Sequence, residues 1–254
     1  MQVDLNADMG ESFGPWPMGD DTRLLQIVTS ANIACGAHAG DPDVMAATMR
    51  IAKENNVGIG AHPGFPDLAG FGRRRMHIPL SSLANSVRYQ VGASLGMAKA
   101  NGATVRHIKL HGALANMCTE NEDMATACYD AVLSVDPDLI IMVIAATAQD
   151  RAVRKLGCKF ACEIFADRAY NDDATLVDRS KPGAVIHDAK HAGARMVDMV
   201  KAQAIITESG KRIETPIDTI CCHGDTPEAV DIAQEVRSGL KAAGIEVKQF
   251  EGRI

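Results

Sequence analysis

Short apolar segments alternate with alanine-rich segments along the whole chain, and this alternation limits the folds open to it. The apolar segments have the length of strands, and those between them have the length and composition of helices. The expected strands are residues 3–7, 30–35, 57–61, 105–110, 139–144, 159–165, 217–222 and 246–249. The expected helices are residues 21–29, 42–55, 81–101, 121–135, 148–156, 188–208 and 227–243. Such alternation predicts a parallel sheet, either open or closed into a barrel.

Polar side chains on the strands distinguish between an open sheet and a barrel. A parallel strand covered by helices on both faces is apolar throughout, whereas several of these strands have one polar face with a period of two residues. Such a face in the first strand carries Asp4, Asn6 and Asp8. We therefore predict a distorted (β/α) TIM-like barrel of parallel strands with polar residues inside, formed by residues 1–254 as a single domain. A doubly wound sheet is the alternative.

Composition excludes several other classes of protein. The chain has 254 residues, a net charge of −6 and scattered Lys and Arg, so it offers no basic face to nucleic acid or to an anionic membrane. The longest apolar run, residues 139–146, is too short to cross a bilayer, and residues 1–6 do not resemble a signal peptide. The seven cysteines form no C-x-x-C pair, which predicts free thiols. We expect a cytoplasmic protein.

Five segments that combine glycine with histidine or charged residues, and a sixth with three charged residues, follow six of the expected strands. They are residues 6–14, 32–41, 60–64, 109–112, 163–168 and 222–225. Because active sites of parallel α/β folds lie at the carboxyl ends of the strands, these segments predict one shared site. The candidate catalytic residues are Asp8, His38, His62, Lys109, His111, Asp167, Arg168, His223 and Asp225. The candidate substrate-binding residues are Asn6, Glu11, Asn32 and Glu163.

Structural roles compete with functional ones at some of these positions. Asp8 and Asp225 are also suited to cap helices, and Asp167 and Arg168 to form a structural ion pair. A lysine inside a barrel is costly unless it is paired or catalytic, which favours a functional Lys109. For His107 the alternatives are packing and function, and for residues 73–75 they are a solvated face and an anion site. We expect Cys221 and Cys222 to pack in the core. We expect a surface position for His77, His187 and His191.

Several familiar motifs are absent from the sequence. There is no phosphate loop, no dinucleotide fingerprint, no serine elbow and no H-E-x-x-H helix. The residues alone therefore predict a hydrolase-like or metal-assisted site rich in His, Asp and Lys. In a metal-dependent deacetylase or amidohydrolase, Asp8 with His38, His62 or His111 would hold a divalent ion that activates water.

The segments at the strand ends also resemble one family, the LamB/YcsF family. The similarity lies in residues 4–14, 29–42, 59–67, 70–74, 165–170, 182–186 and 222–225, and it extends to about Phe250. Four residues depart from those common in the family: Ala37 replaces an aromatic residue, Leu110 a proline, Ala115 a tyrosine and Ala174 a glycine.

The resemblance implies a barrel of the glycoside hydrolase/deacetylase type and an ATP-dependent 5-oxoprolinase activity. This reaction opens the lactam of 5-oxo-L-proline (pyroglutamate) to give L-glutamate, with ATP and Mg²⁺ as co-substrate and with subunits B and C as partners. Lys109 and Arg168 are then expected to contact phosphoryl oxygens. The base for water is expected to be Asp8 or Asp225 with one of the site histidines, His38, His62, His111 or His223. The alternative functions are a metal-dependent deacetylase and a noncatalytic scaffold subunit.

Overall fold

Seven parallel strands close into a barrel in the computed structural model, which describes residues 1–224 and 228–254. In order around the barrel they are β1 (Gln2–Met9), β2 (Ser30–Ala34), β3 (Gly58–His62), β4 (Val105–Lys109), β5 (Ile140–Ile144), β6 (Phe160–Phe165) and β9 (Thr219–Cys222). The barrel closes because β9 pairs with both β6 and β1. A short β10 (Glu246–Val247) pairs with the start of β1. The predicted TIM-like barrel is confirmed.

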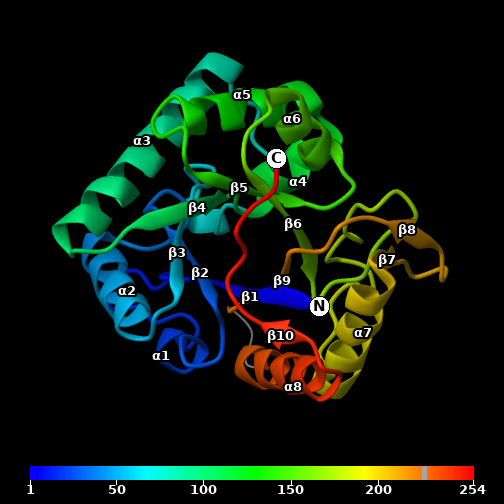
Figure 1. Cartoon of the computed structure of the whole chain (residues 1–254). Helices are drawn as coiled ribbons and strands as arrows, with labels where there is room; N and C mark the ends of the chain where they lie inside the picture. The colour runs from blue at the N-terminus through cyan, green and yellow to red at the C-terminus, as the bar shows by residue number, and fades with distance from the viewer. Residues whose placement is uncertain (225–227) are drawn as a thin grey trace.

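Helices surround the strands, as Figure 1 shows in a view along the barrel. They are α1 (Asp21–Leu24), α2 (Pro42–Glu54), α3 (Leu80–Ala100), α4 (Gly112–Glu120), α5 (Glu122–Leu133), α6 (Ala148–Leu156), α7 (Ala189–Ala202) and α8 (Ala229–Ala242), with a 3-10 turn, η1, at Leu68–Gly70. Asp41 caps α2 by accepting hydrogen bonds from the amides of Asp43 and Val44. Within the described part of the chain, no helix has the length and apolar character of a membrane span.

The two faces of the strands are separated as the period-two pattern predicts. Val3, Leu5 and Ala7 of β1 are fully or almost fully buried in the main hydrophobic core. Asn6 and Asp8 point the other way and contact polar side chains of neighbouring strands. The inside of the barrel is therefore a polar network, and its hydrogen bonds compensate for the burial of these groups.

Two expected helices end earlier than predicted, and one helix was not predicted. The helix expected over residues 188–208 stops at Ala202, because Gln203 adopts a left-handed φ of 45°. The β-branched residues that follow form a hairpin of β7 (Ala204–Ile206) and β8 (Arg212–Glu214). The helix expected over residues 21–29 is only the short α1, and α4 occupies residues expected to form a loop. Pro227, at the start of the helix expected over residues 227–243, lies outside the described residues.

Asp4 lies at the amino-terminal end of the barrel and has no access to solvent. The hydroxyls of Thr29, Ser30 and Thr219 donate hydrogen bonds to its carboxylate, at 2.7, 2.7 and 2.5 Å. Burial outweighs these bonds and raises the pKa of Asp4 to about 6. Asp4 is therefore costly to ionise in the folded protein and cheap to ionise in the unfolded chain.

We expect Asp4→Asn to remove a pH-dependent loss of stability. Because the folded pKa is above the unfolded one, the stabilising contribution of Asp4 is present below about pH 4 and is lost as the pH rises through 6, a change of about 3 kcal/mol. Urea unfolding of both proteins between pH 4.5 and 7.5 should show the parent losing stability relative to the variant. Parallel pH curves would refute the assignment.

Candidate active site

The expected site residues converge at the carboxyl ends of the strands, around a cavity of about 520 Å³. Its lining includes the following predicted residues: Asp8, His62, Lys109, His111, Glu163, Arg168 and His223. Basic side chains from surrounding loops also line it: Arg73, Arg75, Arg179 and Lys181. The cavity therefore combines a floor of paired acids and bases with an excess of positive charge, which favours an anionic ligand.

Lys109 occupies the floor of this cavity and is almost completely buried. Its ammonium group lies 2.8 Å from Asp8 Oδ1, 2.9 Å from Glu163 Oε1 and 3.0 Å from Cys221 Sγ. Burial by itself would lower the pKa of Lys109, but the carboxylate of Asp8 and its other neighbours hold this pKa well above its usual value. Lys109 is therefore a fixed positive charge. The pKa of the neighbouring Glu163 is raised by burial.

Asn6 and Asn32 hold these carboxylates in place from inside the barrel. The Asn32 amide donates to Asp8 Oδ1 at 2.9 Å and to Asn6 Oδ1 at 2.7 Å, and the Asn6 amide donates to Glu163 Oε1 at 3.1 Å. Among the described residues that line the cavity neither asparagine is present. The structure thus places both predicted substrate-binding asparagines behind the site, where they position Asp8 and Glu163.

His107 belongs to the same interior network. Its Nε2 donates to Asn32 Oδ1 at 2.9 Å, and its ring packs against Phe250. Burial lowers the pKa of His107 to about 3, so the ring is neutral. Of the two roles considered for His107, the structure supports packing with a satisfied hydrogen bond.

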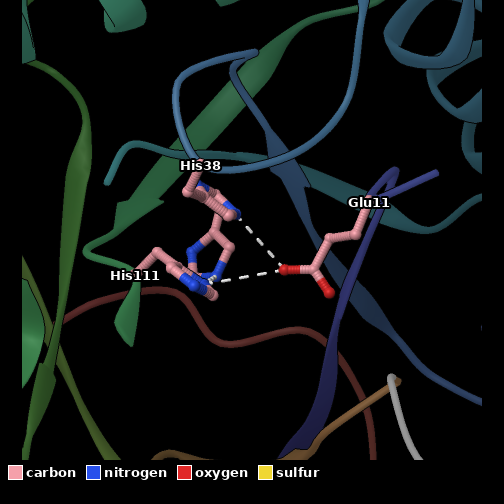
Figure 2. Close-up of side chains that lie close together, drawn as sticks. Glu11, His38 and His111 are labelled. Carbon is pink, nitrogen blue, oxygen red and sulfur yellow. Dashed lines mark hydrogen bonds and ion pairs between the residues drawn. The ribbon is translucent and has the colours of Figure 1, made fainter. Parts of the chain in front are cut away.

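A second group joins one acid and three histidines beside the cavity. Figure 2 shows the carboxylate of Glu11 directed at His38 and His111, with Oε1 at 3.3 Å from His38 Nε2 and 3.6 Å from His111 Nδ1. His62 joins them, with its Nε2 at 3.0 Å from His111 Nδ1. Burial holds the pKa of both His38 and His111 well below the usual range. These residues have the composition of a metal-binding cluster.

A glycine in the loop after β3 permits this close arrangement. Gly72 has a φ of +62°, and a Cβ atom there would lie 2.7 Å from both His38 Cβ and His111 Cδ2. Such contacts are too short for any other residue, and the left-handed backbone also favours glycine. Gly72 therefore lets the backbone of this loop lie close to His38 and His111.

A third group pairs His223 with Asp167. His223 Nδ1 lies 2.9 and 2.8 Å from the two carboxylate oxygens of Asp167, and Phe165 stacks on the imidazole. Burial raises the pKa of Asp167, but the adjacent His223 more than compensates, and the pKa is lowered. Asp167 therefore fixes the orientation of His223. The other ring nitrogen, Nε2, can then exchange a proton with a ligand.

Arg168 does not form the structural ion pair with Asp167 that was considered as an alternative to a functional role. Its guanidinium donates hydrogen bonds to the carbonyl oxygens of Val177 and Ala184, which hold the loop after β6 against the barrel. Burial and the nearby Arg179 lower the pKa of Arg168 to about 10. In the same loop, Ala174 is buried with a left-handed φ of 70°, at the position where glycine is common in the family.

The other predicted residues have the following places. Of residues 73–75, for which an anion contact was considered, Arg73 and Arg75 line the cavity. Arg74 pairs with Asp67 and Arg75 with Glu120. His77, His187 and His191 are exposed, as expected. Asp225 lies outside the described residues, so neither its catalytic nor its capping role is described.

Three contributors to the site were missed in the sequence. Cys221 was expected only to pack, yet its sulfur contacts the Lys109 ammonium. Its position on the inward-facing side of β9 was the available signal, because it shares that face with Thr219. Arg179 and Lys181 also line the cavity, and they come from an irregular loop that shows no periodic pattern.

The fold and the site together define an α/β barrel with an acid–base centre at the carboxyl ends of its strands. The LamB/YcsF family model matches residues 3–254, and the chain belongs to this family. A relative from Ruegeria pomeroyi, named as the A subunit of 5-oxoprolinase, is 70% identical over 250 residues, which are 98% of this chain and 99% of the relative.

Solved structures agree with this assignment. The structure of a lactam utilization protein from Thermus thermophilus superposes with a TM-score of 0.92 at 40% identity, covering 98% of this chain and 100% of the other. A structure described as T48 deacetylase with substrate has a TM-score of 0.50 at 13% identity, covering 98% of this chain and 87% of the other. The second likeness concerns the fold alone, and it supports the glycoside hydrolase/deacetylase type of barrel.

Proposed function

We propose that this chain is the A subunit of an ATP-dependent 5-oxoprolinase. The enzyme would act in the cytoplasm, open the lactam of 5-oxo-L-proline to L-glutamate and convert ATP to ADP and phosphate. The observation that carries the proposal is the 70% identity, over nearly the full length of both chains, to a relative with this name. The lactam utilization protein from Thermus thermophilus supports the same substrate class. The comparisons do not favour the deacetylase alternative.

The chemistry of the reaction fits the charges of the cavity. Amide resonance makes a five-membered lactam a poor electrophile, and transfer of a phosphoryl group to its oxygen creates a leaving group. Such a transfer requires cations near the phosphoryl oxygens. Lys109 and Arg168 remain the proposed contacts, and Arg73, Arg179 and Lys181 line the same cavity. We propose that the loop residues add positive charge to that of Lys109, which pairs with Asp8 and Glu163.

Water attack on the activated lactam requires a base, for which His223 is the best-placed candidate. Its Nδ1 is held by Asp167, so Nε2 can accept a proton, and the ring lines the cavity. Asp8 is less suited to this role, because it contacts both Lys109 and Asn32 and its pKa lies well below the usual value. We propose that Asp8 orients Lys109.

The nucleotide site is proposed to involve partner chains. The sequence has no phosphate loop, and the name of the Ruegeria pomeroyi relative refers to one chain of a larger enzyme. We therefore propose that ATP and Mg²⁺ bind where this cavity meets subunits B and C. The arginines and Lys181 would then face the phosphates.

The proposal is tested by measuring glutamate release from 5-oxoproline in the presence of ATP and Mg²⁺. The chain is assayed alone and then together with its B and C partners, with ADP measured in parallel. We expect glutamate and ADP in equal amounts from the complete mixture only. A silent mixture, combined with ATP-independent release of acetate or ammonia from other amides by the chain alone, would favour the deacetylase instead.

A further inference from the structure

Two histidines beside the cavity each direct one ring nitrogen at the other. His62 Nδ1 lies 2.8 Å from the Lys109 carbonyl oxygen, and His111 Nε2 lies 2.8 Å from the Phe71 carbonyl oxygen. A carbonyl oxygen only accepts hydrogen bonds, so each of these nitrogens carries the ring proton. The opposite nitrogens, His62 Nε2 and His111 Nδ1, face each other at 3.0 Å, and both carry lone pairs whenever no further proton is bound.

Carboxylate oxygens approach the same two nitrogens. Glu11 Oε1 lies 3.6 Å from His111 Nδ1, and Asp8 Oδ2 lies 3.4 Å from His62 Nε2. Lone pairs and carboxylates that converge in a buried place repel one another unless something positive lies between them. Either a proton or a metal ion can meet this need.

We propose that a divalent transition-metal ion, Zn²⁺ in the first instance, is bound by His62 Nε2, His111 Nδ1 and Glu11 Oε1. Zinc bonds to histidine and carboxylate measure about 2.0–2.2 Å, which separates neighbouring ligand atoms by about 3.3 Å in a tetrahedron. The observed separations of 3.0 and 3.6 Å lie on either side of this value. The two backbone carbonyls act as the outer hydrogen-bond partners that fix the tautomers of metal-binding histidines.

His38 has a different role from the other two histidines. Its ring is stacked on His111 with centroids 3.6 Å apart and planes only 5° from parallel, so one ion cannot lie in the plane of both rings. A histidine binds a metal in the plane of its ring. His38 Nε2 instead donates to Glu11 Oε1 at 3.3 Å and positions that carboxylate. Three protein ligands therefore leave a coordination position open, as in catalytic zinc sites.

The type of ligand selects the metal. Two imidazoles and one carboxylate favour Zn²⁺, Co²⁺ or Ni²⁺, whereas Mg²⁺ prefers a shell of oxygen atoms. This ion is therefore distinct from the Mg²⁺ proposed to accompany ATP. The set also differs from the one expected from the sequence, because Glu11, and not Asp8, belongs to the cluster that contains His62 and His111.

The experiment is a metal titration of the full chain without substrate or partners. After removal of metal with a chelator, we expect the parent to bind one Zn²⁺ per chain in competition with a chromophoric chelator, and one Co²⁺ with visible absorption bands. His111→Asn should weaken Zn²⁺ binding at least 100-fold, and the isosteric Glu11→Gln at least 10-fold. The control His77→Ala changes an exposed histidine and should bind like the parent.

Melting temperatures separate loss of the ligand from loss of the fold. Added Zn²⁺ should raise the Tm of the parent and of His77→Ala, but not of Glu11→Gln, whose Tm in the metal-free state should match the parent. Absence of one-to-one uptake by the parent would overturn the proposal and assign the contact between His62 and His111 to a shared proton. Equal uptake by the parent and both ligand variants would overturn it as well. Because no substrate is used, failure here is distinguishable from failure of the proposed function.

Discussion

Replacing Lys109 with methionine should lower glutamate formation by the assembled enzyme by at least 10²-fold. The change removes the positive charge between Asp8 and Glu163 and leaves their carboxylates facing each other without a cation. Loss of one fixed electrostatic group in an active site typically costs about 10²–10³ in rate. Removing one partner of a buried pair should also cost about 3–5 kcal/mol of stability. Glutamate and ADP assays, together with urea unfolding, measure both effects.

A second variant separates catalysis from folding. Lys109→Met combined with Glu163→Gln removes one of the two uncompensated acids and should recover part of the lost stability without recovering activity. The matched control is Lys155→Met, which breaks an exposed pair with Glu122 and should change stability by at most about 1 kcal/mol. Full activity of Lys109→Met in the complete mixture would exclude a catalytic role. A defect in assembly alone would favour the scaffold function.

The barrel could be predicted from the sequence because its strands have two chemically different faces. Alternation of Leu5 with Asn6 and Asp8 is visible without a structure, and it excludes a strand that is covered by helices on both sides. The hairpin of β7 and β8 was missed, because Ile205 and Ile206 continue the apolar pattern of the preceding helix. What ends that helix is the left-handed Gln203, a backbone property that the residue type does not reveal.

The sequence was enough to predict which residues belong to the site, but not which of them contact one another. His62 ends β3, and His111 and His223 lie just after β4 and β9, so their convergence follows from a parallel barrel alone. Which acid meets which histidine depends on the loops. Glu11 reaches His38 and His111, while Asp167 reaches His223, and no spacing in the sequence encodes these pairs.

Interior hydrogen bonds explain why the two predicted asparagines lie behind the cavity and do not line it. Asn6 and Asn32 carry the same signal as the cavity residues, namely polar groups on the inner face of a strand. The strands are long enough to hold several layers of side chains, and only the layers nearest the carboxyl ends meet the cavity. Depth along the strand, which sequence reasoning did not use, separates positioning residues from those that contact a ligand.

Replacing His223 should have the second large effect, and Asp167 should act through it. We expect His223→Ala to lower kcat of the assembled enzyme by about 10²–10⁴, the usual contribution of a positioned acid or base. Asp167→Asn keeps the shape of the side chain but no longer fixes the His223 tautomer, so a smaller loss in kcat is expected. Steady-state glutamate release at saturating 5-oxoproline and ATP measures both variants.

The double variant and chemical rescue test whether the pair works as a unit. If Asp167 acts only by orienting His223, the double variant should be no slower than His223→Ala, because effects within a unit are not additive. Added imidazole should restore part of the activity of His223→Ala, which a purely structural histidine would not allow. The control is His187→Ala, whose ring lies 3.6 Å from Glu228 on the surface and should be dispensable. Additive losses, or full activity of His223→Ala, would show that another group accepts the proton, and the acid–base role would then pass to the cluster around Glu11.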